Sequence, residues 1–163
     1  MDKPYTFEDY RKIVETLRSE EGCPWDRAQT HESLKPCMIN EMTEAVAAVD
    51  LLRETRDWDN LCEELGDLLL LILLQSQIAK EEGYFSLDDV IQKAAEKMVR
   101  RHPHVFPDED GKKGAPDWNA IKEREKAGKT PEQRAFAKNA EKKAAEEVCR
   151  HLQEEYCCCL NST

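Results

Sequence analysis

Apolar residues recur at helical spacing in several stretches of this chain, separated by breaks rich in glycine, proline and charged residues. This period predicts amphipathic or buried helices, because one face of a helix repeats every three to four residues. The predicted helices cover residues 7–20, 38–52, 60–82, 87–102, 119–127 and 131–156. In the fourth helix, four residues are expected to point inward: Val90, Ile91, Ala94 and Met98. No stretch alternates like a strand, so the predicted class is all-α.

The segment LLLLILL at residues 68–74 is compatible with either a buried strand or a helix when judged by periodicity alone. It continues without a break from CEELGD into QSQIAKEE, which favours one long helix closed by Gly83. A helix that is apolar on most of its circumference is buried on most sides. In a small chain this predicts a helix-hairpin core completed by oligomerisation, as a homodimer or a higher homo-oligomer.

Composition narrows the classes of partner. The 163 residues carry a formal net charge of -10, which argues against unspecific binding of nucleic acid or of an anionic membrane. No apolar run approaches the roughly 20 residues of a membrane helix, and the first residues lack the apolar core of a signal peptide. Seven irregularly spaced cysteines favour reduced thiols and a cytoplasmic protein over a disulfide framework. Zinc binding by the adjacent Cys157, Cys158 and Cys159 is disfavoured, because neighbouring cysteines chelate poorly.

Two pairs of acids occur in neighbouring predicted helices. Glu41 and Glu44 are three residues apart, as are Glu64 and Asp67, so each pair shares a helix face. The short polar turn between these helices predicts an antiparallel hairpin. Glu41 with Asp67, and Glu44 with Glu64, are both symmetric about Glu54, near that turn. The four carboxylates are therefore expected at one level of the hairpin.

Four acids at one level repel one another unless a cation binds between them. Oxygen ligands without His or Cys suit a hard ion such as Mg²⁺, with Mn²⁺ as a substitute. A di-iron site is disfavoured because no histidine follows a glutamate by three residues. Exposed, solvated acids are the alternative interpretation. Glu63 points away from Glu64 and is either an additional ligand or an exposed acid.

A basic cluster and a polar loop offer contacts for an anionic ligand. Lys97, Arg100 and Arg101 suit phosphate binding beside an acidic metal site, or they complement the dipole at the end of their helix. The segment GCPWDRAQTHESLKP at residues 22–36 is predicted to be a loop with room for a short turn of helix. It contributes Trp25 and His31, which are candidates for contacting a base. Trp25 has a second interpretation, as a side chain that fills the core.

Four motifs in order, GCPWDRAQTHESLKP, NEMTEA, EELGDLL and KMVRRHPHVF, resemble the MazG family of nucleoside triphosphate pyrophosphohydrolases, and the likeness covers residues 7–126. The resemblance implies an all-α fold, assembly into at least dimers, and Mg²⁺-dependent hydrolysis of nucleoside triphosphates to the monophosphate and pyrophosphate. It also implies contacts from Lys97 and Arg101 to the triphosphate. Its implied metal ligands are Glu41, Glu44, Glu64 and Asp67.

The chain departs from the family pattern at Asn40, where a glutamate is usual. This departure supports an alternative hypothesis, a catalytically weakened nucleotide-binding or regulatory protein on the same scaffold. The motifs place a pyrophosphohydrolase-like domain at residues 1–130. Residues 131–163 form a predicted extension, either a helix that packs on the bundle or a flexible tail.

Overall fold

The computed structural model describes residues 4–107, 110–114, 118–128 and 130–157, and no strand occurs in them. This confirms the all-α class. The helices are α1 (Phe7–Leu17), α2 (Pro24–Ala28), α3 (Lys35–Thr55), α4 (Asp59–Glu81), α5 (Leu87–Arg101), α6 (Trp118–Ala127) and α7 (Pro131–Leu152), the last followed by a π-helical turn, Gln153–Cys157. The chain divides into two compact units, residues 1–88 and 89–163, and each is described by itself. The predicted boundary at residue 130 stays a prediction.

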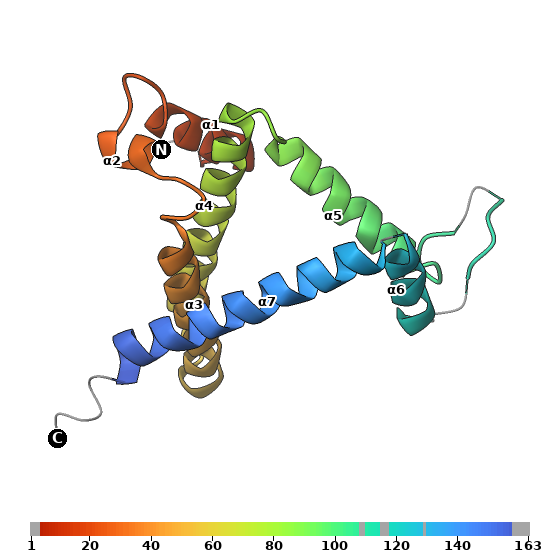
Figure 1. Cartoon of the computed structure of the whole chain (residues 1–163). Helices are drawn as coiled ribbons and strands as arrows, with labels where there is room; N and C mark the ends of the chain where they lie inside the picture. The colour runs from red at the N-terminus through yellow and green to blue at the C-terminus, as the bar shows by residue number, and fades with distance from the viewer. Residues whose placement is uncertain (1–3, 108–109, 115–117, 129, 158–163) are drawn as a thin grey trace. The chain divides into compact units, whose positions relative to one another are not determined.

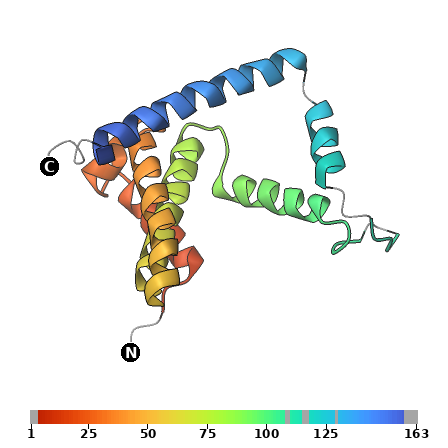
Figure 2. The ribbon, with the colours of Figure 1, turned by 90° about the horizontal axis from the view of Figure 1, so that it is seen from below.

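The first unit is built on the predicted hairpin, in which α3 and α4 lie side by side (Figures 1 and 2). α3 is longer than predicted at both ends. Pro36, the last residue of the predicted loop, lies in the first turn of α3, where the backbone N–H that proline lacks would have no partner in the helix. Arg56 ends the helix in the left-handed conformation, with φ 63° and its N–H bonded to the Leu52 carbonyl.

The apolar run at residues 68–74 is helical, as its setting predicted, and it supplies much of the core of the first unit. Its buried side chains pack with Val14 of α1, Leu34 and Leu87: they are Leu71, Leu73, Leu74 and Ile78. Gly83 ends α4 at φ 76°, and the Tyr84 N–H reaches back to the Ala79 carbonyl at 2.9 Å. This left-handed cap explains the glycine.

α1 packs against α4 and starts with a capping box, in which Thr6 and Asp9 each bond the other's backbone N–H. It ends at Leu17 rather than at residue 20, because the chain turns back and the Cys23 N–H binds the Leu17 carbonyl at 2.8 Å. A Cβ atom on Gly22 would lie 2.3 Å from that same carbonyl oxygen. Only glycine fits this turn without a shift of the backbone.

Arg18 ties the segment after α1 to the end of α4. Its side chain is only 6% exposed, and its guanidinium donates to the Glu81 carboxylate at 2.7 Å. It also donates to the carbonyl oxygens of Asp26 and Gln29, at 2.5 and 3.1 Å. One buried cation therefore fixes α2 and the following loop on the hairpin.

The second unit contains α6, α7 and nearly all of α5. One prediction for α5 is wrong: Ile91, Ala94 and Met98 are exposed, and only Val90 is partly buried. A stripe of apolar residues shows which face of a helix prefers burial. It does not show whether another part of the same chain packs against that face. α7 begins with a capping box between Thr130 and Gln133 and has no buried residue among those described.

Among the residues that the structure describes, no helix combines the length and the apolar character that a membrane span requires. The cysteines in this part of the chain are free thiols: Cys23, Cys37, Cys62, Cys149 and Cys157. The prediction for the terminal triplet is not tested, because Cys158 and Cys159 lie outside the described residues.

We predict that Arg18→Ala lowers the free energy of unfolding by about 2–3 kcal/mol, because a nearly buried cation with a carboxylate and two carbonyl partners is lost. Urea unfolding measures the change. The matched control is Arg53→Ala, which removes an exposed pair with Asp50 and should change stability by less than about 0.5 kcal/mol. Equal losses in the two variants would contradict the anchoring role of Arg18.

Candidate metal centre

Three of the four predicted ligands converge in the hairpin. Glu41 from α3 and Glu64 and Asp67 from α4 each offer a carboxylate oxygen, and these oxygens lie within 4.8 Å of one another. Glu44 lies on α3 outside this group and is exposed, but its charge acts on Glu41. Glu63 is also exposed and outside the group. The matched levels inferred from sequence thus bring three acids into one small volume, with a fourth nearby.

The electrostatics of this acid cluster (Glu41, Glu64 and Asp67) favour a cation. The pKa of Glu41 is raised, first by burial and then by the negative charges of Asp67, Glu44 and Glu64. The ion pairs found in the described part of the chain include none with a member of the cluster. Oxygen-only donors that are partly buried and uncompensated fit a hard divalent ion such as Mg²⁺ or Mn²⁺.

Glu64 is the buried member of the acid cluster, at 7% exposure. Its Oε1 accepts a hydrogen bond from Asn60 Nδ2 at 2.9 Å. Asn60 is not among the site residues predicted from the sequence. The spacing could have indicated it, because an asparagine four residues before a glutamate lies on the same face of a helix and can donate to its carboxylate.

α1 covers the hairpin close to the acid cluster. The Tyr10 hydroxyl donates a long hydrogen bond, 3.5 Å, to the Gly66 carbonyl oxygen. Burial and the charge of Asp67 raise the pKa of Tyr10, because both disfavour a phenolate there. Tyr10 therefore stays a neutral donor beside this carboxylate.

The loop residues predicted to contact a base have different surroundings. His31 is tied to α4: its Nδ1 bonds Gln75 Oε1, and Gln75 Nε2 donates to the His31 carbonyl at 3.3 Å. The His31 Nε2 lies 3.7 Å from Glu82. Trp25 is 59% exposed, so the interpretation that it fills the core is wrong. Gln75, which is not among the residues predicted from the sequence, fixes the segment after α2 through His31.

The basic cluster belongs to the second unit, where one carboxylate holds two of its members. Glu125 binds Arg100 at 2.7 Å and Arg101 at 2.5 Å. These bonds lower the pKa of Glu125 to about 2. The Arg101 guanidinium also lies over the Trp118 ring, 5.0 Å from its centroid. Lys97 is exposed on the same helix.

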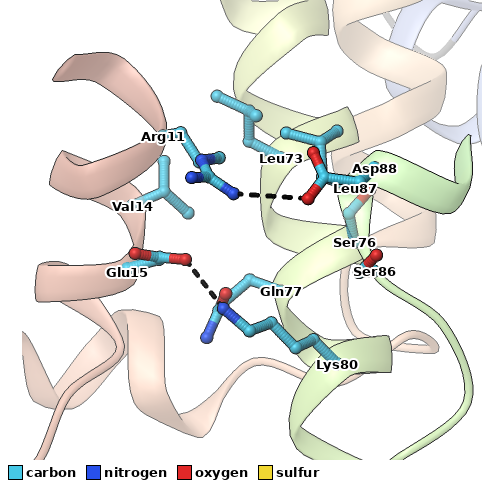
Figure 3. A pocket seen from close by; sticks show the side chains of 10 residues that line it. All are labelled: Arg11, Val14, Glu15, Leu73, Ser76, Gln77, Lys80, Ser86, Leu87 and Asp88. Carbon is cyan, nitrogen blue, oxygen red and sulfur yellow. Dashed lines mark hydrogen bonds and ion pairs between the residues drawn. The ribbon is translucent and has the colours of Figure 1, made fainter. Parts of the chain in front are cut away.

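Figure 3 shows a pocket between α1, α4 and the start of α5, and none of the predicted site residues lines it. Its volume of about 60 Å³ is far below the roughly 300 Å³ at which ligand pockets begin. Two ion pairs cross it, Glu15 to Lys80 at 2.8 Å and Arg11 to Asp88 at 3.8 Å. The ion pairs link α1 to α4 and to the first residues of α5, and the pocket is too small for a nucleotide.

The sequence of this chain is similar to those of known proteins. Residues 29–106 match the MazG nucleotide pyrophosphohydrolase domain, a range that contains the whole acid cluster. The chain is 50% identical, over 76% of its length, to the nucleoside triphosphate pyrophosphohydrolase/pyrophosphatase MazG of Thermotoga maritima. It is 49% identical over 75% of its length to the uncharacterized protein YabN of Bacillus subtilis, and 40% identical over 72% to the nucleoside triphosphate pyrophosphohydrolase of Escherichia coli.

The chain spans only part of these relatives. The matched regions cover 46% of the Thermotoga protein, 25% of YabN and 44% of the Escherichia coli protein. The likeness therefore concerns one domain of longer proteins.

We predict that Glu41→Gln stabilises the metal-free chain at pH 7 by up to about 1 kcal/mol, because it removes one charge from a repelling, partly buried group. The folded-state pKa of Glu41 is raised above its usual 4.5, so its ionised form opposes folding above that raised pKa. The advantage of the variant should vanish as the pH falls through it. Urea unfolding in EDTA between pH 7 and pH 4 measures this.

Glu63→Gln is the matched control, since Glu63 is an exposed glutamate of the same hairpin outside the acid cluster. Its stability should stay within about 0.5 kcal/mol of the parent. A destabilised Glu41→Gln would show that the carboxylate is satisfied without a cation.

Proposed function

Because residues 29–106 belong to the MazG nucleotide pyrophosphohydrolase domain family, we propose that this chain hydrolyses nucleoside triphosphates to the monophosphate and pyrophosphate, with Mg²⁺ or Mn²⁺ as cofactor. The observation that carries the proposal is the acid cluster, whose three carboxylates lie within 4.8 Å inside the matched range. Such a cluster suits an ion that also binds substrate phosphates. The names of the Thermotoga and Escherichia coli relatives support the same reaction.

In this proposal the metal is held by Glu41, Glu64 and Asp67, with Glu44 as a further ligand from the same face of α3. A divalent ion bound there supplies Lewis-acid polarisation of phosphate oxygens and a lowered pKa for water. The protein supplies the fixed negative charge that selects the ion. It also supplies the rigid hairpin that keeps the carboxylates at one level.

In the chemical step, a water oxygen forms a bond to the α-phosphorus while the bond from that phosphorus to the β-bridging oxygen breaks. Pyrophosphate leaves, and the water loses a proton. Glu41 or Glu63 is proposed to accept this proton. Glu41 is favoured because it lies in the acid cluster, where burial and the neighbouring negative charges raise its pKa.

Lys97, Arg100 and Arg101 are proposed to bind the triphosphate and to offset charge that develops on the leaving pyrophosphate. The fork of a guanidinium suits two phosphate oxygens, and Glu125 already orders both arginines. Trp25 is proposed to stack on the base, since much of its indole is exposed. His31, tied to Gln75, is proposed to contact the nucleotide from the same loop.

The competing proposal is a nucleotide-binding or regulatory protein without turnover. Asn40 favours it, because a neutral amide stands beside Glu41 where the family pattern has another carboxylate. The same assay separates the two functions, since a binding protein has nucleotide affinity but forms no product.

We predict pyrophosphate release, with an equal amount of monophosphate, from at least one member of a panel of canonical and modified nucleoside triphosphates in Mg²⁺, and none in EDTA. Glu64→Gln should slow release by at least about 100-fold, because loss of a direct ligand costs no less than loss of an outer-shell partner. Glu63→Gln should keep most of the rate. Binding without product would favour the regulatory protein, and an active Glu64→Gln variant would reject the metal site.

A homo-oligomer is proposed as the assembly, on the basis of apolar side chains left exposed on the hairpin. Met42 and Val46 of α3 and Leu65 and Ile72 of α4 are exposed although most of α4 is apolar. Large apolar side chains that are exposed together on packed helices favour an interface in soluble proteins. A second copy of the hairpin would bury it.

We predict that Leu65→Glu converts the assembly to monomers, because the carboxylate would lose its hydration in an apolar interface. Light scattering after size exclusion measures the mass. Tyr84→Glu is the control, since Tyr84 is 73% exposed in the turn after α4, and it should leave the mass unchanged. A monomeric parent chain would contradict the proposed assembly.

A further inference from the structure

Glu64 poses an energetic problem that the other acids of the cluster share only in part. Glu64 is 7% exposed, and unlike the nearly buried side chain of Arg18, which pairs with Glu81, it takes part in none of the ion pairs found among the described residues. A carboxylate away from water needs hydrogen bonds or an opposite charge. The hydrogen bond that the structure gives it comes from Asn60.

The position of Asn60 is suited to holding this carboxylate in one orientation. Asn60 is the second residue of α4 and lies one turn before Glu64, so both side chains project from the same face of one rigid helix. Its Nδ2 reaches Glu64 Oε1 at 2.9 Å, and Asn60 is itself partly buried. A bond to one oxygen restricts rotation of the carboxyl group and leaves its second oxygen for another partner.

The chemistry of the donor matters as much as its position. An amide donates a hydrogen bond without bringing a positive charge. A lysine or arginine at residue 60 would instead neutralise the carboxylate and compete with a divalent cation for it. Asn60 therefore holds the Glu64 carboxyl group by a hydrogen bond and adds no positive charge to the acid cluster.

We propose that Asn60 is a positioning residue for the metal centre, which fixes the Glu64 carboxylate in the orientation that binds the divalent ion. This inference rests on the proposed function, because it requires a metal between Glu41, Glu64 and Asp67. Asn60 touches neither the ion nor the nucleotide in this role. It acts through Glu64, as outer-shell partners of metal ligands do.

The test is calorimetric titration of the metal-free protein with Mn²⁺ in the absence of nucleotide. Asn60→Ala removes the donor, and Asn60→Leu removes it while keeping the bulk of the side chain. Both variants should bind Mn²⁺ about 10-fold more weakly or worse. The matched control is Gln92→Ala, because Gln92 Nε2 donates to Glu96 Oε1 at the same spacing on α5, where both residues are exposed. Its Mn²⁺ affinity should equal that of the parent.

A second readout separates positioning from damage to the fold. The metal-free variants should unfold with the same cooperativity as the parent, but Mn²⁺ should raise their melting temperature by less. Their pyrophosphate release, low at limiting metal, should recover as Mn²⁺ is raised toward saturation. A fold defect would not be repaired in this way.

Parent-like Mn²⁺ affinity in both Asn60 variants would overturn the inference and leave the proposed function intact. Recovery of affinity in Asn60→Leu but not in Asn60→Ala would also overturn it, because bulk rather than the hydrogen bond would then matter. Absence of Mn²⁺ binding by the parent chain would reject the metal centre, and the role of Asn60 with it.

Discussion

Repulsion between carboxylates on facing helices is the constraint around which the first unit is organised. Glu41, Glu64 and Asp67 lie within one small volume, and the pKa of Glu41 is raised by burial and by its neighbours' charges. Such an arrangement lowers the stability of a metal-free protein, so it persists only where other contacts hold the helices together. A strained cluster held by a rigid frame is suited to binding a small, highly charged ion with little rearrangement.

Apolar packing and hydrogen bonds both hold the helices of the first unit in place. Leu71, Leu74 and Ile78 lock α4 to α1 and to the loop before α3, and each buried side chain of this size contributes roughly 1.5–3 kcal/mol. Arg18 and Gln75 then tie the segment 24–31 to α4 through hydrogen bonds. The acid cluster therefore sits on a surface whose geometry is set by contacts outside the site.

In the second unit, ion pairs connect two helices: Glu125 joins α6 to the end of α5 through the guanidinium groups of Arg100 and Arg101. Arg101 and Lys122 both lie near the Trp118 ring, and Ile121 of α6 is buried. Ile91, Ala94 and Met98 of α5 remain exposed. The helix therefore carries ordered cations together with exposed apolar side chains, in keeping with the proposed assembly and the proposed phosphate contacts.

The sequence by itself determined the longer helices, the hairpin and the common level of three of its four acids, because helical spacing and symmetry about a short turn depend only on chain geometry; it did not determine the short helix α2. It also indicated the family through the order of its motifs. It did not predict that Pro36 lies in the first turn of α3. It also predicted that Ile91 and Met98 point inward, because an apolar face of a helix does not reveal whether another element packs against it. Only the tertiary structure decided which carboxylate is buried, that Glu44 lies outside the cluster, and that Glu125 pairs with Arg100 and Arg101. Burial and contacts between residues far apart in the chain follow from packing, which no local pattern specifies.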